Sequence, residues 1–360
     1  MGKVCSSAIR DARAVFAGIF KVSPEQVLFT GGGTEADNMA VYGVALPALA
    51  SAQKTSAKPR VLCSAIEHPA VRNTVQSLEA LGFDVHLIPV DGSGQIVREK
   101  YEALLTPETV LVSIHQVNNI LGAILPVEEL AQIAKRKVPG LVFHTDAVQA
   151  FCKVRSPVAG SGVDLVSISG HKIEGPKGVG ALIVLNKELL KNKKLRPFIW
   201  GGEQEAGFRS GTQSAGLIAG FGAAAASMVA GIADHAEKVR KLRVQFRKGL
   251  EAHSLIGTAL TWNSPDDGLP HIVSLSAPNL PAPMLAGLLD EEGFMISTGS
   301  ACSSGKSMPD AVLTALGLPF SHRASSLRVS FSHRQSISEV DGLVDALART
   351  ISKLQKALVG

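Results

Sequence analysis

The sequence has few cysteines, few aromatic residues and no block of charge of one sign. Its four cysteines, Cys5, Cys63, Cys152 and Cys302, are too scattered for a disulfide framework or a zinc motif. The 36 basic and 31 acidic side chains are spread along the chain, without interleaved basic and aromatic residues. A nucleic-acid partner is therefore not predicted.

One uncharged stretch of 22 residues, 212–233, is long enough to be tested as a membrane span. It consists mostly of Ala, Gly and Ser, which are weakly apolar, so we expect a buried, closely packed helix and no membrane partner. No signal peptide is recognised, and few cysteines favour a reducing compartment. We expect a cytoplasmic protein, with the mitochondrion left open as an alternative.

Hydrophobic residues make up 46% of the 360 residues and charged residues 19%, which is typical of a well-buried globular protein. Short apolar runs alternate with helical patterns over the first two thirds of the chain. This alternation predicts an α/β fold with a mostly parallel sheet covered by helices on both faces. We expect a large domain over residues 1–230 and a smaller α+β domain over residues 231–360.

Polar residues gather where the predicted strands end. Gly31–Thr34 follows one strand and opens a helix, Asn118–Asn119 follows another, and Asp146 closes a third. Lys172 lies in a tight, glycine-flanked turn after a fourth strand. Ligands of parallel sheets bind beyond the carboxyl ends of the strands, so these residues are predicted to share one pocket.

Two of these residues form a chemically meaningful pair. A lysine at one strand end and an acid at another are what pyridoxal phosphate requires: the lysine forms a Schiff base, and the acid keeps the pyridine nitrogen protonated. Taken alone, the turn that holds Lys172 could equally be an ordinary surface turn. Likewise, the glycines before Thr34 could belong to an ordinary strand–helix loop, and His68 could simply cap a helix.

Seven motifs in order resemble those of the cysteine desulfurases, which are class V, fold-type I pyridoxal-phosphate enzymes close to the selenocysteine lyases. The motifs are FTGGGTEADN, EHPAV, VNN, HTDAVQ, SGHKIEGPKGVGAL, GGEQEAGFRSGT and STGSACSS. The resemblance implies a two-domain fold-type I architecture and a homodimer.

The resemblance also implies roles for individual residues. Lys172 would hold the cofactor and act as acid and base, His68 would cover the ring face, and Asp146 and Gln149 would tune the ring. Asn119 would bond the phenolic oxygen of the cofactor and contribute to the substrate site, and Arg328 would bind the carboxylate of the substrate. The implied phosphate ligands are Gly33, Thr34, Ser169, His171 and, from the other subunit, Thr212.

Cys302 lies in a small, polar stretch, Ser297–Gly305, and an exposed thiol there is either incidental or a mobile nucleophile. Cys5, Cys63 and Cys152 fall in helical or strand patterns and are predicted to be buried and inert. The resemblance implies that Cys302 takes sulfur from L-cysteine as a persulfide and releases alanine. A sulfur-acceptor protein, such as an iron–sulfur scaffold, would then receive the sulfur.

Two features depart from the family pattern. Ile120 stands where the family usually has an acid, and the usual N-terminal segment, which lines the active site, has no counterpart. We therefore expect a chain that binds the cofactor but turns over slowly. The alternatives left open are a selenocysteine lyase, another class V enzyme such as an aminotransferase, and an impaired subunit that serves interactions.

Overall fold

The computed structural model describes residues 2–52, 57–253, 259–298 and 311–359, and the contacts divide the chain into two units. The first unit comprises residues 1–89, 96–117 and 125–232. The second comprises residues 233–360 together with two short excursions, 90–95 and 118–124. Asn119 therefore belongs to the second unit, although it lies far from residues 233–360 in the sequence.

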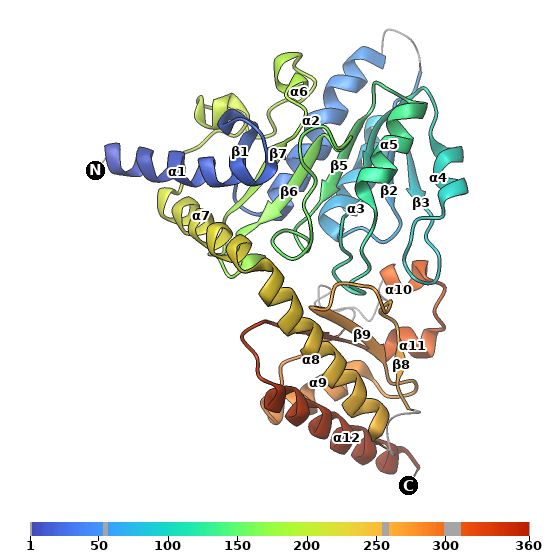
Figure 1. Cartoon of the computed structure of the whole chain (residues 1–360). Coiled ribbons are helices and arrows are strands. Elements are labelled where there is room, and N and C mark those ends of the chain that lie inside the picture. The colour runs from blue at the N-terminus through green and yellow to red at the C-terminus, as the bar shows by residue number, and fades with distance from the viewer. Residues whose placement is uncertain (1, 53–56, 254–258, 299–310, 360) are drawn as a thin grey trace. The chain divides into compact units, whose positions relative to one another are not determined.

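The first unit is built on a seven-stranded sheet in the order β1-β7-β6-β5-β4-β2-β3 (Figure 1). Five neighbouring strands, from β3 to β6, run parallel, and β7 is antiparallel to both of its neighbours. The prediction of a mostly parallel sheet is confirmed. The strands are β1 Val27–Thr30, β2 Arg60–Ser64, β3 Asp84–Ile88, β4 Thr109–Ser113, β5 Val142–Asp146, β6 Leu165–Ser169 and β7 Gly180–Val184.

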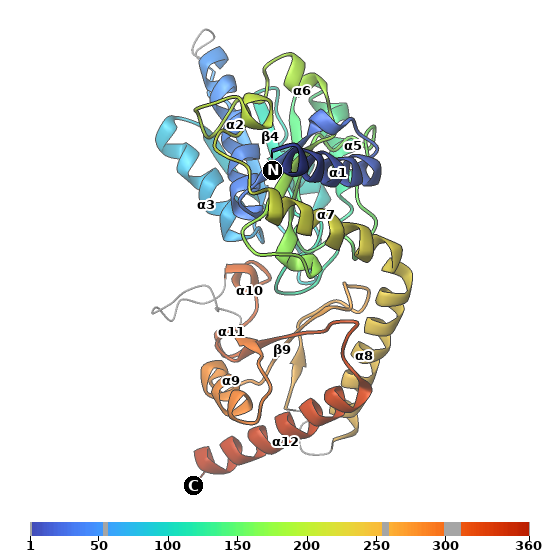
Figure 2. The ribbon, with the colours of Figure 1, turned by 90° about the vertical axis from the view of Figure 1, so that its left-hand side faces the viewer.

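Helices lie on both sides of this sheet, as predicted, with α2 and α3 on one side and α1, α5 and α7 on the other (Figure 2). Alternate strand residues such as Leu28, Val61 and Val142 pack with α2 and α3. The helices of this unit are α1 Gly2–Phe20, α2 Gly33–Ala52, α3 Pro69–Ser77, α4 Arg98–Leu104, α5 Val127–Lys137, α6 Glu188–Lys191 and α7 Ala215–Ala230.

Aromatic rings fill the opposite side of the sheet. The ring of Phe16 on α1 lies 5.8 Å from that of Phe29, 6.0 Å from that of Phe151 and 4.5 Å from that of Phe221 on α7. Gly222 lets α7 approach α1 closely, since a Cβ there would lie 2.7 Å from the Cβ of Ala12. The small residues of the uncharged stretch 212–233, which was tested as a membrane span, thus allow close packing between helices.

The helix predicted for the uncharged stretch 212–233 is α7, and a second helix, α8 (Ile232–Ala252), follows it after a break at Gly231. Glycine has low helix propensity, which explains a break at this residue. Among the described residues no single helix is long and apolar enough to cross a membrane; α7 and α8 reach the length and composition only when taken together.

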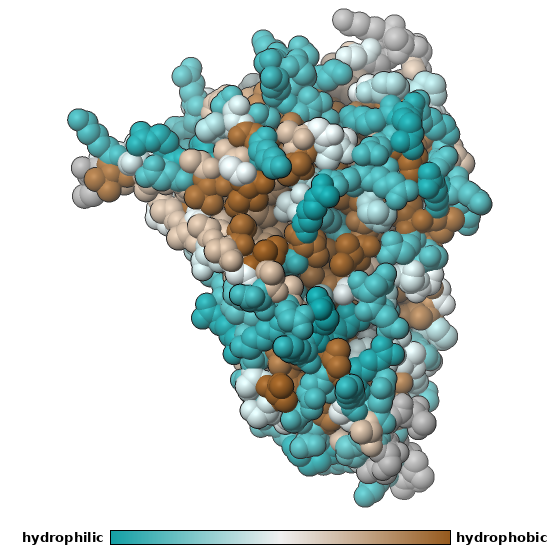
Figure 3. Space-filling view, viewed as in Figure 1, coloured by the Kyte–Doolittle hydropathy of each residue, from teal (hydrophilic) through white to brown (hydrophobic). Residues whose placement is uncertain are grey.

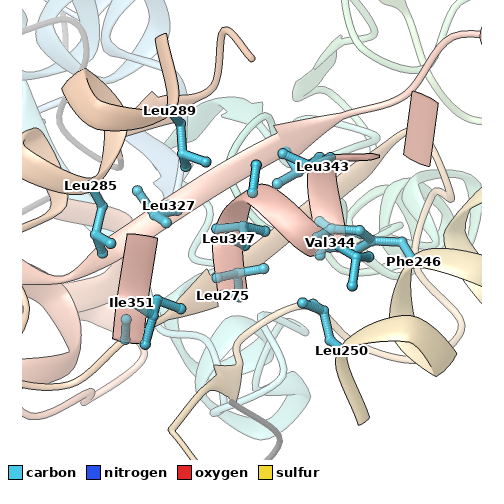
Figure 4. Packing of buried hydrophobic residues seen from close by; sticks show 14 of the residues in the cluster. Phe246, Leu250, Leu275, Leu285, Leu289, Leu327, Leu343, Val344, Leu347 and Ile351 are labelled. Atoms are coloured by element: carbon cyan, nitrogen blue, oxygen red, sulfur yellow. The ribbon is translucent and has the colours of Figure 1, made fainter. Parts of the chain in front are cut away.

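The second unit contains a four-stranded antiparallel sheet in the order β10-β11-β9-β8. Leucine, valine and phenylalanine side chains from this sheet and from α8, α9 and α12 form its core (Figure 4). The strands are β8 Thr261–Trp262, β9 Ile272–Ser276, β10 Ser297–Thr298 and β11 Ser326–Ser330. The remaining helices are α9 Ala282–Glu291, α10 Ala311–Ala315, α11 Phe320–Ala324 and α12 Ile337–Val359.

Candidate active site

The candidate site occupies the edge of the first unit's sheet where the parallel strands end. Gly33, His68 and Lys172 follow β1, β2 and β6, and Asp146 is the last residue of β5. All four of these strands run in the same direction. The predicted convergence of these residues on one sheet edge is therefore confirmed for the first unit.

Lys172 lies in a short 3-10 helix, Gly170–Ile173, directly after β6. Backbone hydrogen bonds of 3.0 Å from Gly170 N to Val179 O and from Gly175 N to Gly170 O hold this turn. Position 170 admits only glycine, because a Cβ there would lie 2.9 Å from Pro176 O. The half-buried side chain of Lys172 thus projects from a constrained turn, which does not fit an ordinary surface loop.

Asp146 is a buried carboxylate at the end of β5, with 7% of its surface exposed. Its Oδ1 accepts a hydrogen bond of 2.8 Å from Val148 N. Burial and the anion of Glu67 raise the pKa of Asp146, whereas the hydrogen bond from Val148 and the charges of His115 and Lys172 lower it, and the net result is a pKa of about 6. Asp146 is therefore an incompletely compensated buried acid, suited to a cationic partner.

Replacing Asp146 with asparagine is expected to stabilise the ligand-free protein at pH 7 by about 3 kcal/mol, because a raised native pKa makes ionisation costly in the fold. The native protein should lose this stability as the pH rises from about 4 to about 6, whereas the variant should not. Urea unfolding at pH 4 and pH 7 measures the difference. Asp84→Asn is a control whose expected effect on stability at pH 7 has the opposite sign. Burial raises the pKa of Asp84, but hydrogen bonds from Arg60 and His86 outweigh burial and lower it overall. An equal gain at both pH values would show a packing effect instead.

The glycine turn before α2 forms a cradle for an anion. A Cβ at Gly33 would lie 2.7 Å from Val148 Cγ2, so the close backbone approach requires glycine. The first amides of a helix point outward and favour negative charge. Next to this turn, Ser169 Oγ and His171 Nδ1 lie 2.9 Å apart. Residues 31–35, Asn38, His171, Lys177, Gly178 and Phe198 line an open pocket of about 700 Å³.

His68 is the N-cap of α3, and its Nδ1 accepts a hydrogen bond of 3.1 Å from Ala70 N. Burial and the nearby charge of Lys172 lower its pKa, although the anion of Glu67 opposes this. A neutral ring that accepts at Nδ1 carries its proton on Nε2. The helix-cap interpretation is thus confirmed, and the capping contact leaves the Nε2–H group for other contacts.

A buried polar cluster beneath the site was missed by the sequence reasoning. His144 on β5 lies between Ser113 on β4 and Ser167 on β6, at 2.8 and 2.9 Å. Its Nε2 is 3.7 Å from Asp37 Oδ1 on α2. Burial lowers the pKa of His144 to about 3, so this imidazole is neutral. The signal in the sequence was polar residues at alternate positions within three otherwise apolar strands.

A second feature missed by the sequence reasoning anchors the loop that contains Thr212. Glu205 in this loop is buried and accepts two hydrogen bonds of 2.8 Å from Arg13 on α1. It also accepts a hydrogen bond of 2.9 Å from Phe29 N on β1. The loop is therefore pinned to the first unit and is not merely a flexible surface segment, while Thr212 itself is exposed.

The second unit brings Asn119 and Arg328 together. Arg328 on β11 donates from Nη1 to Asn119 O at 3.0 Å and from Nη2 to Ser297 Oγ at 3.1 Å. Asn118 Oδ1 accepts hydrogen bonds from the backbone of Ile120 and Leu121 at 2.9 and 2.8 Å, so this side chain stabilises a turn. A backbone carbonyl and a hydroxyl thus fix the position of the Arg328 guanidinium.

The cysteine predictions have mixed outcomes. Cys63 and Cys152 are buried, as predicted, and burial raises the pKa of both thiols, to about 12 for Cys152. The prediction for Cys5 was wrong: it is exposed, because α1 buries residues only from Ala12 onward. Cys302 lies outside the described residues.

A model of the family described as Aminotransferase class-V matches residues 1–343. Together with the seven-stranded sheet, this match defines the class of protein as an α/β enzyme of the class-V aminotransferase type. Enzymes of this class and of the cysteine desulfurase family generally depend on pyridoxal phosphate.

Known proteins narrow the class further. A cysteine desulfurase of Cereibacter sphaeroides is 37% identical over 98% of this chain and 87% of its own length. The solved structure of a "NIFS-LIKE PROTEIN" matches with a TM-score of 0.87 and 32% identity over 98% of this chain and 89% of its own. "SspA in complex with cysteine" matches with a TM-score of 0.78 and 32% identity over 93% and 89%. This chain belongs to the cysteine desulfurase family.

Proposed function

We propose that this protein removes sulfur from L-cysteine with pyridoxal phosphate, leaving alanine and a persulfide on Cys302. The observation that carries the proposal is the buried carboxylate of Asp146 at the same sheet edge as the constrained amine of Lys172. The family relationship supports the choice of substrate, as does the similarity to SspA, whose structure is a complex with cysteine.

The residues present fit the cofactor. The glycine cradle at Gly33 and Thr34, with Ser169 and His171 beside it, suits a phosphate group. Asp146 is a buried acid that a protonated ring nitrogen would neutralise. Gln149, Asn119 and the ring of His68 would complete the site, and Thr212 of a partner subunit would add a phosphate contact. When bound, pyridoxal phosphate supplies an electron-withdrawing ring.

The residues of this chain would perform the remaining steps. Lys172 Nζ would bind the cofactor and then take and return a proton at the substrate Cα. The guanidinium of Arg328, a planar fork of donors, would orient the substrate carboxylate. The Cys302 thiolate would attack the substrate sulfur. A sulfur–sulfur bond forms, the carbon–sulfur bond breaks with its electron pair going to carbon, and a proton completes alanine.

We further propose a homodimer in which the first domain, residues 1–230, binds the cofactor and the second, residues 231–360, provides Cys302 and Arg328. Figure 3 shows apolar side chains at the surface of the first unit near α1 and α7. Val4 on α1 is 72% exposed, and Trp200 in the loop before Thr212 is 73% exposed. Such exposed apolar side chains fit a surface that a second copy covers. A sulfur-acceptor protein would receive the persulfide sulfur.

The test is alanine formation from L-cysteine by the purified chain with added pyridoxal phosphate, with selenocysteine as a parallel substrate. The proposal expects equimolar alanine and persulfide sulfur from cysteine. Alanine from selenocysteine alone would favour a lyase specific for selenocysteine, and an absence of turnover despite bound cofactor would favour the impaired interaction subunit.

A further inference from the structure

We propose that His115 is a positioning residue: its cationic imidazole, held by Glu67, keeps the neighbouring carboxylate of Asp146 ionised. His115 follows β4 and Glu67 follows β2, so neither is part of the strand that contains Asp146. The sequence analysis predicts no role for either residue, and the proposed reaction does not use either of them directly.

The backbone fixes His115 beside the end of β5. Ile114 N donates to His144 O at 3.1 Å, and Gln116 N donates to Asp146 O at 2.9 Å. His115 thus lies between two ladder hydrogen bonds to the strand that ends in Asp146. A change of position would require breaking these bonds.

Glu67 holds the imidazole from the other side. Its Oε1 accepts a hydrogen bond of 2.7 Å from His115 N and lies 3.2 Å from His115 Nδ1. Because a carboxylate oxygen accepts, Nδ1 is a donor here. His115 and Glu67 are only 2% and 3% exposed, so solvent does not screen the pair. Burial alone would lower the pKa of His115, but attraction to Glu67 and Asp146 raises it overall.

The surrounding charges show why this cation matters. Glu67 raises the pKa of Asp146, whereas His115 and Lys172 lower it. Asp37 on α2 also faces Asp146, but burial and that neighbour raise its pKa far above its usual range, which disfavours its charged form. The other imidazoles nearby, His144 and His68, have lowered pKa values. Without His115, two buried carboxylates would be left with Lys172 as their cation.

The first experiment titrates the cofactor-free, full-length protein by carbon-13 NMR of aspartate carboxyl groups, with Asp146→Asn identifying the signal. The native midpoint is expected near 6. His115→Gln should move it up by about one pH unit or more, since the anion of Glu67 is then uncompensated. The double variant Glu67→Gln/His115→Gln removes both charges and should return the midpoint to within about half a unit of the native value. His86→Gln, on β3, is the matched control and should leave the midpoint of Asp146 unchanged.

The outcomes separate charge from structure. A purely structural role for His115 would shift the single and double variants alike, or neither, and either result would overturn the proposal. If His115→Gln does not fold, NMR of the histidine side chains in the native protein still tests whether the ring of His115 is cationic. Both ring nitrogens of His115 should carry protons at pH 7, and a neutral ring would reject the assignment.

A second measurement links the pair to the cofactor and rests on the proposed function. For a shift of one pH unit, the dissociation constant of pyridoxal phosphate should rise about twofold in His115→Gln at pH 7, because about half of Asp146 is then protonated. This difference should vanish at pH 8.5, where Asp146 is ionised in both proteins. A constant difference at both pH values would count against action through Asp146. The carboxyl titration involves no cofactor, so failure of the proposed function would leave its result standing.

Discussion

Lys172→Ala is expected to abolish the covalent bond between protein and cofactor and to lower alanine formation by roughly 10³-fold or more, as loss of a catalytic nucleophile does. The amine is expected to act at two points, in holding the cofactor and in moving the proton at the substrate Cα, so no other group can replace it fully. Borohydride reduction followed by peptide mass analysis measures the covalent bond directly.

The matched control is Lys187→Ala, an exposed lysine before α6, which should behave like the native protein. The result that would contradict the assignment is a reduced cofactor attached elsewhere in Lys172→Ala. Lys153 is the amine to inspect, because burial and the charge of Lys172 lower its pKa to about 8, and its Nζ already donates to Gln149 O at 3.2 Å.

Cys302→Ser is expected to retain the cofactor and bind L-cysteine but to form no persulfide. A serine hydroxyl is not ionised near neutral pH and is a far weaker nucleophile toward sulfur than a thiolate, so turnover should fall by on the order of 10³-fold. Thiol-specific labelling of the protein after exposure to cysteine, with location of the modified peptide, measures the loss.

Cys5→Ser provides the control, because Cys5 is the exposed cysteine within the described part of the chain. It should form persulfide at the native rate. Native labelling in Cys302→Ser would instead move the nucleophile to another cysteine. Cys63 and Cys152 are poor candidates, since burial raises the pKa of both thiols and so disfavours the reactive thiolate.

Much of the fold could be predicted from the sequence because apolar runs and helical patterns alternate with clear breaks. The strands that end near Thr30, Asp146 and Ser169 were predicted to within a residue or so, and with them the sheet edge that gathers the site. The break at Gly231 and the two-residue strand β10 were not predicted. A lone glycine is compatible with a helix, and two residues carry no periodicity.

Site residues could be predicted only where their role follows from their own position at the end of a strand. Lys172 and Asp146 could be proposed from their positions, and the family resemblance supplied their partners. Glu67 and His115 could not, since their pairing depends on β2 and β4 being neighbours in the sheet. Cys5 was misassigned because the helical pattern of α1 fixes a face without showing where along the helix burial begins.

The contact between Arg13 and Glu205 joins the first helix to a loop 192 residues further along the chain. Glu205 also holds the amide of Phe29, so a single carboxylate ties together α1, β1 and the loop before Thr212. In native-state hydrogen exchange these three segments should therefore open as one cooperative unit. Fraying of the first helix would therefore loosen β1 and the loop before Thr212, and with them the proposed phosphate cradle, before the other strands of the sheet unfold.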